Sequence, residues 1–332
     1  MFIVQNYAVA VVLCVITMIC WGSWANTQKL ASGRWRFELF YWDYVLGVLL
    51  MAVIFAFTLG STGSHGRSFL DDLGQADASN LGSALLGGVI FNAANILLVA
   101  SIALAGMAVA FPVGIGMALV LGVVVNYVAQ PKGSPELLFA GVGLIAAAIV
   151  LDAVAYSRLP GQQTGRKTLG LVLAIICGLL MGFFYRFVAA AMSTNFTAME
   201  PGKLSPYTAM VVFAVGMLLS NFVFNTAIML KPFQGEPVPP VEYLRGSPSD
   251  HLWGVVGGMI WAVGMTLSII AFGVAGGAIS YGLGQGATLV AAFWGVFIWR
   301  EFREAPPGTN PLLAAMFVGY IAGLALIIYS GA

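Results

Sequence analysis

The sequence contains ten apolar segments, each long enough to cross a lipid bilayer as a helix. A helix needs about 20 mainly apolar residues to span a hydrocarbon core of about 30 Å. The runs show none of the alternation of a barrel strand, and an isolated strand would leave its backbone polar groups unpaired in lipid. The sequence therefore predicts an all-α integral membrane protein with ten transmembrane helices. The predicted spans are 7–26, 37–60, 79–104, 106–129, 134–156, 168–190, 206–230, 250–274, 278–300 and 309–330.

The composition agrees with a chain that is surrounded by lipid. Of the 332 residues, 60% are hydrophobic and only 8% are charged, whereas about 25% of the residues of a soluble domain are charged. The net charge of +1 gives no extended field that would attract nucleic acid. Neither His65 nor His251 has Cys or His neighbours at metal-ligand spacing, so no metal site is predicted. The first segment has no basic residue before it and no cleavage site after it, and is expected to be a permanent span.

The basic residues are distributed unevenly among the linkers, and this predicts an orientation. Because cytoplasmic loops are enriched in Lys and Arg, the side with ten of them should be cytoplasmic and the side with three should not. Both termini would then lie on the non-cytoplasmic side. The short linkers look bacterial, so we expect a bacterial cytoplasmic (inner) membrane. The richer set is Lys29, Arg34, Arg36, Arg158, Arg166, Lys167, Lys231, Arg245, Arg300 and Arg303; the other set is Arg67, Lys132 and Lys203.

The two halves of the sequence resemble each other. When the chain is shifted by 170 residues, Gly87–Tyr127 overlaps Gly257–Phe297 without a gap. A shared bias toward Gly, Ala and Leu raises any such match, but an ungapped overlap of the third and fourth spans with the eighth and ninth favours a repeat. The coinciding pairs include Gly87 and Gly257, Gly88 and Gly258, Ala105 and Ala275, Gly106 and Gly276, and Gly114 and Gly284.

An odd number of spans in each half makes the predicted repeat an inverted one. We expect a first five-helix repeat over residues 1–157, a central linker over 158–167, and a second repeat over 168–332. In transporters, inverted repeats place the substrate site near the midplane, and the two halves exchange conformations during alternating access. The pattern therefore favours a secondary transporter, and no cluster of acid, base or metal-ligand groups indicates an enzyme.

Asp43 is the strongest candidate for energy coupling, because a carboxylate about two turns into a span needs a special environment. One interpretation is an acid that cycles between its charged and neutral forms and so carries the coupling proton. The other is a structural acid that is bonded to a neighbouring helix or to Lys29.

Several polar and aromatic side chains are candidates for substrate binding. Asn92 and Asn95 share a helix face, and they either bind substrate or bridge helices. Gln285 stands among glycines that allow close approach, and its repeat partner is the apolar Ile115. The remaining candidates, for stacking or hydrogen bonding, are Trp24, Tyr44, Trp261 and Tyr281.

Other polar residues are less favoured as site residues. Glu38 lies near Arg36, which favours interfacial pairing. Arg186 would suit an anionic substrate, but snorkelling to the headgroups is the more common outcome. Tyr185 is a further minor candidate. The Gly161–Thr168 segment has irregular spacing and no preceding strand, so no nucleotide cofactor is expected.

Short motifs along the whole chain resemble those of the plant ureide permeases, members of the drug/metabolite transporter superfamily. Rhamnose–proton symporters and glucose/ribose porters are more distantly similar. The motifs are Trp21-Gly-Ser-Trp24, Trp42-Asp43-Tyr44, Ala56–Gly60, Gly87-Gly88-Val89 with Asn95, Asn126-Tyr127, and Phe293-Trp294-Gly295 before Arg300-Glu301-Phe302-Arg303.

This resemblance implies the ten-helix inverted-repeat fold and proton-coupled uptake of ureides such as allantoin or of nucleobases such as uracil and xanthine. Asp43-Tyr44 matches the acidic element of the family, and Asn95 matches an Asn of its third span. The central linker departs from the plant pattern, because those proteins carry a long cytosolic insert there.

The leading hypothesis is a symporter that imports a small, neutral, polar solute and uses the proton gradient as its driving force, with no cofactor. The alternatives are proton-coupled monosaccharide uptake and export of drugs or metabolites. The expected partners are the solute and membrane lipid, without nucleic acid, for a monomer or a homodimer.

Overall fold

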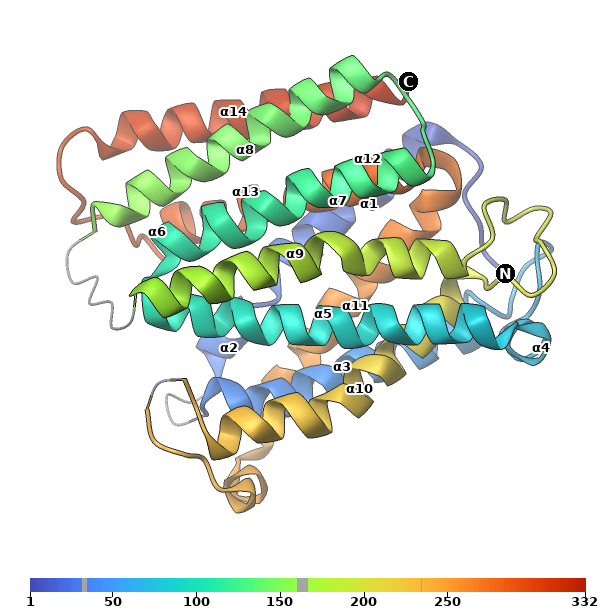
Figure 1. Ribbon diagram of the computed structural model, residues 1–332, viewed down its shortest axis with the longest axis horizontal. Helices are drawn as coiled ribbons and strands as arrows, with labels where there is room; N and C mark the ends of the chain where they lie inside the picture. Colours follow the sequence, from blue (N-terminus) through green and yellow to red (C-terminus); the bar gives the residue numbers. More distant parts are fainter. Residues whose placement is uncertain (32–34, 160–166, 234) are drawn as a thin grey trace.

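The computed structural model describes residues 1–31, 35–159, 167–233 and 235–332. In this part of the chain, ten helices are long and apolar enough to cross a membrane, which confirms the predicted number of spans. The helices lie roughly parallel to one another in a single bundle (Figure 1). Arg34, Arg166 and most of the predicted central linker fall outside the described residues, as does most of the Gly161–Thr168 segment.

The predicted span limits agree with the helices to within a few residues, and the main differences are local breaks. The first span consists of two helices, and the fourth and ninth contain π-helical turns. The helices of the first half are α1 (Tyr7–Ser23), α2 (Asn26–Leu30), α3 (Phe37–Phe57), α4 (Phe69–Gln75), α5 (Ala78–Ala105), α6 (Met107–Ala110), η1 (Phe111–Ile115), α7 (Gly116–Ala129) and α8 (Pro135–Ser157).

The second half has the same number of spans. Its first long helix follows the central linker, and its third is again the longest. The helices are α9 (Lys167–Ala191), α10 (Pro206–Leu230), η2 (Pro240–Arg245), α11 (Pro248–Ala275), α12 (Gly277–Gly284), α13 (Ala287–Phe293), η3 (Trp294–Ile298) and α14 (Thr309–Ser330).

The two ends of the bundle differ in their linkers. Both chain termini and α4 lie at one end, on the right in Figure 1, which we call the terminal end. The opposite end, with α2 and α6, is called the basic end because Lys29, Arg36 and Arg245 lie in its linkers. At the terminal end the chain is tied together by backbone hydrogen bonds, such as that from Ser134 N to the carbonyl oxygen of Ser330 at 2.7 Å.

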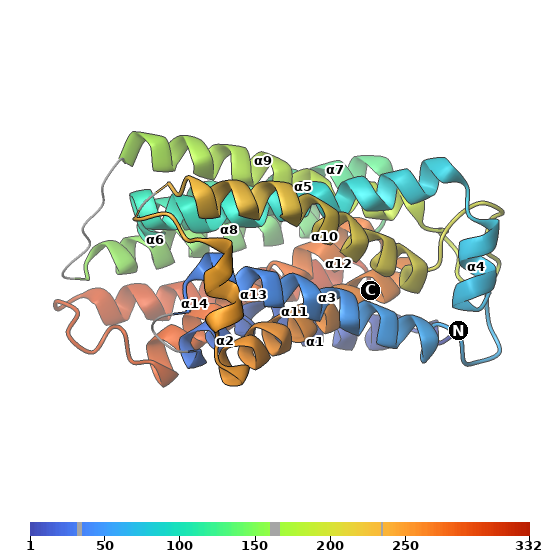
Figure 2. The same ribbon diagram turned by 90° about the horizontal axis from the view of Figure 1, so that it is seen from below.

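The long helices form two layers to which both halves contribute. Figure 2 shows α5, α7 and α9 on one side of the bundle and α1 and α11 on the other. Helix α5 packs along α9 and α10, while α11 packs along α1 and α3. Helices α5 and α11 are the third spans of their halves, α1 and α3 are the first two spans of the first half, and α9 and α10 are the first two of the second. The third span of each half therefore packs on the first two spans of the other half.

Helices α5 and α11 share their length and the conformation at their ends. Both have 28 residues, and their limits are 170 residues apart. The next residues, Gly106 and Gly276, both have φ +80° with ψ 162° and 163°. Only glycine adopts this conformation readily, so each glycine allows a sharp break before the next span. The inverted sense of the two halves and the division at 158–167 stay predictions.

Candidate functional site

A cavity of about 870 Å³ lies between the two layers. Its size is within the range of small-molecule sites, about 300–1,000 Å³. The side chains of Lys29 and Arg36 belong to its lining and are 48% and 36% exposed, so the cavity opens at the basic end. The other lining residues used below are Trp21, Trp24, Trp35, Phe91, Asn95, Ile102, Ile115, Met181, Phe184, Trp261 and Gln285.

Trp261 forms the centre of an aromatic wall at the inner part of this cavity. Its ring lies 4.4 Å from that of Phe91 and stacks at 5.9 Å on Trp21, with an interplanar angle of 10°. Phe213 stacks on it from α10 at 5.9 Å. The ring is only 4% exposed, so its orientation is fixed by its neighbours. A rigid aromatic face of this kind suits a planar or ring-shaped solute.

Two side-chain amides line the same cavity from different helices. Nδ2 of Asn95 donates a hydrogen bond to the hydroxyl of Tyr41 at 3.1 Å, which fixes the amide on α5. Gln285 caps the C-terminus of α12 at the break before α13, where its side chain is 8% exposed and makes no hydrogen bond with any described residue. Together these amides present donors and acceptors beside an aromatic face. The arrangement can bind a neutral solute that carries both carbonyl and N–H groups.

Seven sequence candidates are absent from the lining of this cavity: Asp43, Glu38 and Arg186, which are described below, and the four buried residues Tyr44, Asn92, Tyr185 and Tyr281. Asn92 is fully buried and donates to the carbonyl of Met217 and to the hydroxyl of Ser220, which are the contacts of a helix bridge between α5 and α10. Tyr44 is fully buried and packs on Trp24 at 4.6 Å. The other two, Tyr185 and Tyr281, are buried deeper along the bundle.

The carboxylate of Asp43 lies outside the cavity lining, in a cluster of its own. It accepts a hydrogen bond from the hydroxyl of Tyr243 at 2.5 Å, and Nδ1 of His251 lies 2.9 Å from its Oδ1. The indole ring of Trp35 packs edge-on against His251 at 4.8 Å, and Trp35 also lines the cavity. The side chains of His251 and Trp35 therefore lie between Asp43 and the cavity. The bond from Lys29 goes to Glu301 instead, at 2.8 Å.

Tyr243 is a permanent donor to this cluster. It lies in η2, outside the spans, where burial raises the pKa of its hydroxyl, and its hydrogen bond to the Asp43 carboxylate raises it further. The phenol therefore keeps its proton at physiological pH. Nearby, Glu38 forms an ion pair with Arg36 at 2.5 Å, which is the interfacial pairing favoured by the sequence.

Comparisons with known proteins identify the family. The family model of the ureide permeases matches residues 40–163 and 158–330, which is nearly the whole chain. The chain belongs to the ureide permease family. Ureide permease 2 of Arabidopsis thaliana is similar, with 23% identity over 99% of both chains. Probable ureide permease A3 of Vigna unguiculata is 21% identical over 91% of this chain and 98% of its own.

Membership of this family and the ten apolar helices make the protein an integral membrane transporter. A solved crystal structure shares its fold, with a TM-score of 0.59 and 17% sequence identity over 97% of this chain and 98% of that one. The family model matches in two segments that meet at 158–163, within the linker between the predicted halves.

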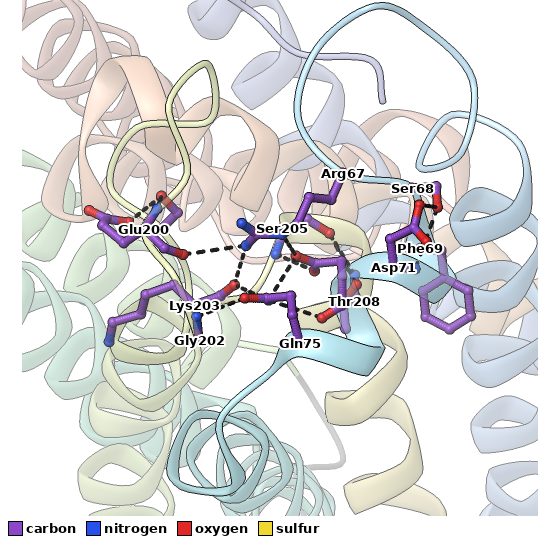
Figure 3. A network of polar contacts seen from close by, with 12 residues as sticks. Arg67, Ser68, Phe69, Asp71, Gln75, Glu200, Gly202, Lys203, Ser205 and Thr208 are labelled. Carbon is purple, nitrogen blue, oxygen red and sulfur yellow. Dashed lines mark hydrogen bonds and ion pairs between the residues drawn. The ribbon is translucent and has the colours of Figure 1, made fainter.

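A polar network, drawn in Figure 3, lies at the terminal end of this permease. Arg67, before α4, pairs with the buried carboxylate of Asp72 at 2.8 Å and donates to the carbonyl of Lys203 at 2.7 Å. Asp72 also accepts from the backbone N–H of Ser205 at 2.7 Å. Gln75 of α4 binds the same loop through the carbonyl of Lys203 and the N–H of Gly202. The network therefore joins linkers from both halves, and we call it the terminal latch.

Glu200 orders the other half of this loop. Burial favours a raised pKa for its carboxyl, but hydrogen bonds from Ser193 and Thr194 outweigh burial and leave the pKa below its ordinary value. A carboxylate with a lowered pKa stabilises the fold above its ordinary pKa, and this contribution is lost as the pH falls through the lowered value.

Two tyrosines separate the cavity from the terminal end. The hydroxyl of Tyr281 donates to the carbonyls of Ala118 and Met181, and that of Tyr185 bonds to the hydroxyl groups of Ser268 and Ser280. The two rings lie 5.4 Å apart. Tyr185 and Tyr281, here called the tyrosine barrier, join α7, α9, α11 and α12 through these bonds.

Sequence reasoning missed part of the site. His251 has no ligand-type neighbours in the sequence, but it lies in the first turn of α11 and contacts Asp43. Tyr243 and Trp35 have no spacing or composition signal that links them to Asp43. Trp21 was visible within its Trp-x-x-Trp motif, since residues three apart share a helix face.

Proposed function

We propose that this protein is a proton-coupled symporter that imports a small neutral ureide such as allantoin, or a nucleobase such as uracil or xanthine. The curated relatives are named as ureide permeases, and the lining of the cavity supports the same class of solute. The observation that supports this substrate class most directly is that Trp261, Asn95 and Gln285 line one cavity. A flat ring packs against the aromatic wall that is centred on Trp261, while its carbonyl and N–H groups bond to the two amides.

The conformation supports alternating access. The cavity opens at the basic end, while the tyrosine barrier and the terminal latch close the other end. If the basic end is cytoplasmic, as the distribution of Lys and Arg predicts, this is the inward-open state. Both termini are then non-cytoplasmic, in the inner membrane of a bacterium.

Asp43 is proposed to carry the coupling proton. Its carboxylate is 2% exposed and is bonded to His251 and Tyr243, and Trp35 connects this cluster to the cavity lining. A proton that binds there changes the contacts of α3, η2 and α11 together. The proton gradient is then the only driving force, and no cofactor takes part. The transporter works as a monomer or a homodimer.

Uptake into proteoliposomes tests the proposal. Radiolabelled allantoin, uracil and xanthine are offered with and without an inward proton gradient. We expect accumulation of at least one of them, and collapse of the gradient should abolish it. If no ureide, purine or pyrimidine is transported, the substrate class is wrong.

A monosaccharide is the second candidate, because the same aromatic face and amides also suit a sugar ring. Unlabelled rhamnose, glucose and ribose are therefore included as competitors. Competition by a sugar without competition by any nucleobase or ureide would decide for sugar transport. Accumulation only under an outward gradient would indicate export.

A further inference from the structure

A second, smaller pocket of about 310 Å³ lies at the terminal end, beyond the tyrosine barrier. We propose that it is a binding site for the ureido group of the solute, at which the solute is held on that side of the barrier before or after transport. This inference rests on the proposed function. The residues that line the pocket and carry the argument are Asn126, Gln130, Arg186, Glu200, Lys203, Phe272 and Gly277.

Arg186 supplies an unused cationic donor to this pocket. Its side chain is half-buried on α9 and forms no hydrogen bond or ion pair with any described residue. The neighbouring charges are already bound: Lys203 donates to Asn80 and to the carbonyl of Ala190, and Glu200 accepts from Ser193 and Thr194. The guanidinium is therefore available to a planar acceptor, for which its paired N–H groups are well shaped.

Asn126 and Gln130 supply unused acceptors. Asn126 is 2% exposed, and its Nδ2 donates to the carbonyl of Gly122 at 2.8 Å, while its Oδ1 has no partner among the described residues. Oε1 of Gln130 is likewise buried without a described partner. A buried acceptor without a donor is unfavourable unless a ligand bonds to it. A ureido group has the matching chemistry, because its carbonyl oxygen accepts from Arg186 and its N–H groups donate to the two amide oxygens.

Three helices connect this pocket to the cavity at the basic end. On α9, Met181 and Phe184 line the cavity and Arg186 lines the pocket, with Tyr185 of the barrier between them. The same order is found on the other two helices. On α11, Trp261 lines the cavity, Ser268 bonds to Tyr185 of the barrier, and Phe272 lines the pocket. Along α12 and its C-cap, Gln285 lines the cavity, Tyr281 belongs to the barrier, and Gly277 lines the pocket.

The predicted repeat relates the two spaces to each other. Ile102 lines the cavity, and Phe272, which is 170 residues further on, lines the terminal pocket. When the halves exchange conformations, the residues around the pocket take the places that the cavity residues hold in this structure. The pocket is then the collapsed form of the outward-facing solute site, and opening the tyrosine barrier joins it to the cavity.

Transport measured from both faces of the membrane tests this site. Arg186→Gln removes the charge-assisted hydrogen bond, which contributes about 1.5–3 kcal/mol and corresponds to roughly 10- to 100-fold. We expect the KM for allantoin presented to the terminal end to rise by about this factor. The KM for allantoin presented to the basic end should change less than about 2-fold. Arg186→Lys, which keeps the charge without the paired geometry, should give an intermediate rise.

Arg245→Gln is the control, because Arg245 is exposed at the basic end and, among the described residues, pairs only with Glu242. Acetate serves as a competitor that has an anionic acceptor but no ureido N–H, and it should not compete at the terminal end. An equal change of KM at both faces, no change at either face, or competition by acetate alone would overturn the assignment of the pocket. Failure of the unaltered protein to transport any ureide would instead refute the proposed function.

Discussion

Nδ1 of His251 lies 2.9 Å from Oδ1 of Asp43, although the two residues are 208 positions apart in the sequence. The contact joins the second span of the first half to the third span of the second half. Gly254 makes it possible, since a Cβ atom there would lie 2.4 Å from that of Asp43. A change of charge at Asp43 therefore acts on a contact between the two halves, which move relative to each other in the proposed alternating-access cycle.

Replacement of Asp43 by Asn should uncouple transport from the proton gradient. The amide keeps the shape of the carboxylate and can still accept from Tyr243, so the fold should be retained, but it cannot take up a proton. We expect no gradient-driven accumulation of allantoin in proteoliposomes, with exchange of labelled for unlabelled solute preserved. Tyr243→Phe, which removes one donor but no titrating carboxylate, is the control and should retain accumulation. Full accumulation by the Asn variant would reject the coupling role.

Removal of the Trp261 indole should weaken solute binding. Stacking of a nucleobase on an aromatic ring contributes about 1–3 kcal/mol, so Trp261→Ala should raise the Kd of xanthine roughly 10- to 100-fold, and Trp261→Phe should raise it less. Binding is measured by calorimetry on the purified protein. Trp253→Phe, on the same helix but away from the cavity lining, is the control. A Kd that is equal in the Ala variant and the unaltered protein would show that the solute does not stack on this wall.

Gln285 should contribute one hydrogen bond to the solute. A net contribution of about 0.5–1.5 kcal/mol predicts that Gln285→Met raises the KM of uptake by up to about 10-fold. Its repeat partner Ile115 also lines the cavity but offers no polar group, so Ile115→Leu should leave KM nearly unchanged. A similar rise of KM in both variants would indicate a change of cavity shape instead of a lost hydrogen bond.

The spans were predictable from the sequence, but the contacts of the site were predictable only in part. The length of an apolar run depends on the local sequence alone, and the limits predicted for the spans 206–230 and 309–330 agree with α10 and α14 to the residue. Asn95 and Gln285 stood out because amides are costly in lipid, and both line the cavity. The same signal selected Asn92, whose bridge to Ser220 satisfies its amide elsewhere. The free-energy cost of a side-chain amide in lipid does not tell whether its hydrogen-bond partner is another helix or a solute.

The remaining features depend on packing between distant segments. The pairing of Asp43 with Tyr243 and His251 is set by the path of the linker before α11, and this linker has no periodicity that would reveal it. The π-helical turn at Phe111–Ile115 contains Pro112, which cannot donate a backbone hydrogen bond. A local irregularity was thus foreseeable there, but its form was not.

Loss of Arg67 should open the terminal latch. Asp72 is fully buried and would lose its cationic partner, and breaking a buried pair typically costs about 3–5 kcal/mol. We expect Arg67→Ala to lower the melting temperature and to increase thiol labelling of a cysteine placed at Ser205. Arg245→Ala breaks an exposed pair with Glu242 and should change neither quantity. Unchanged labelling in the Arg67 variant would mean that other contacts hold this end closed.

Close packing of the helices at Gly88 and Gly258 should be intolerant of a single added methyl group. These glycines are 170 residues apart, and a Cβ atom would lie 2.0 Å from the carbonyl oxygen of Phe213 at the first and 1.9 Å from that of Tyr44 at the second. Both obstacles are backbone atoms, so relief requires that two helices separate. Gly88→Ala and Gly258→Ala should each destabilise the protein by at least the ~1–3 kcal/mol typical of overpacked cores, measured as a lower melting temperature.

Gly82→Ala is the matched control on α5, because no atom lies within 4 Å of its Cβ position. There, the higher helix propensity of Ala should stabilise the helix by about 0.5–1 kcal/mol. Equal stability of the Gly82 and Gly88 variants would contradict the close approach of α5 to α10.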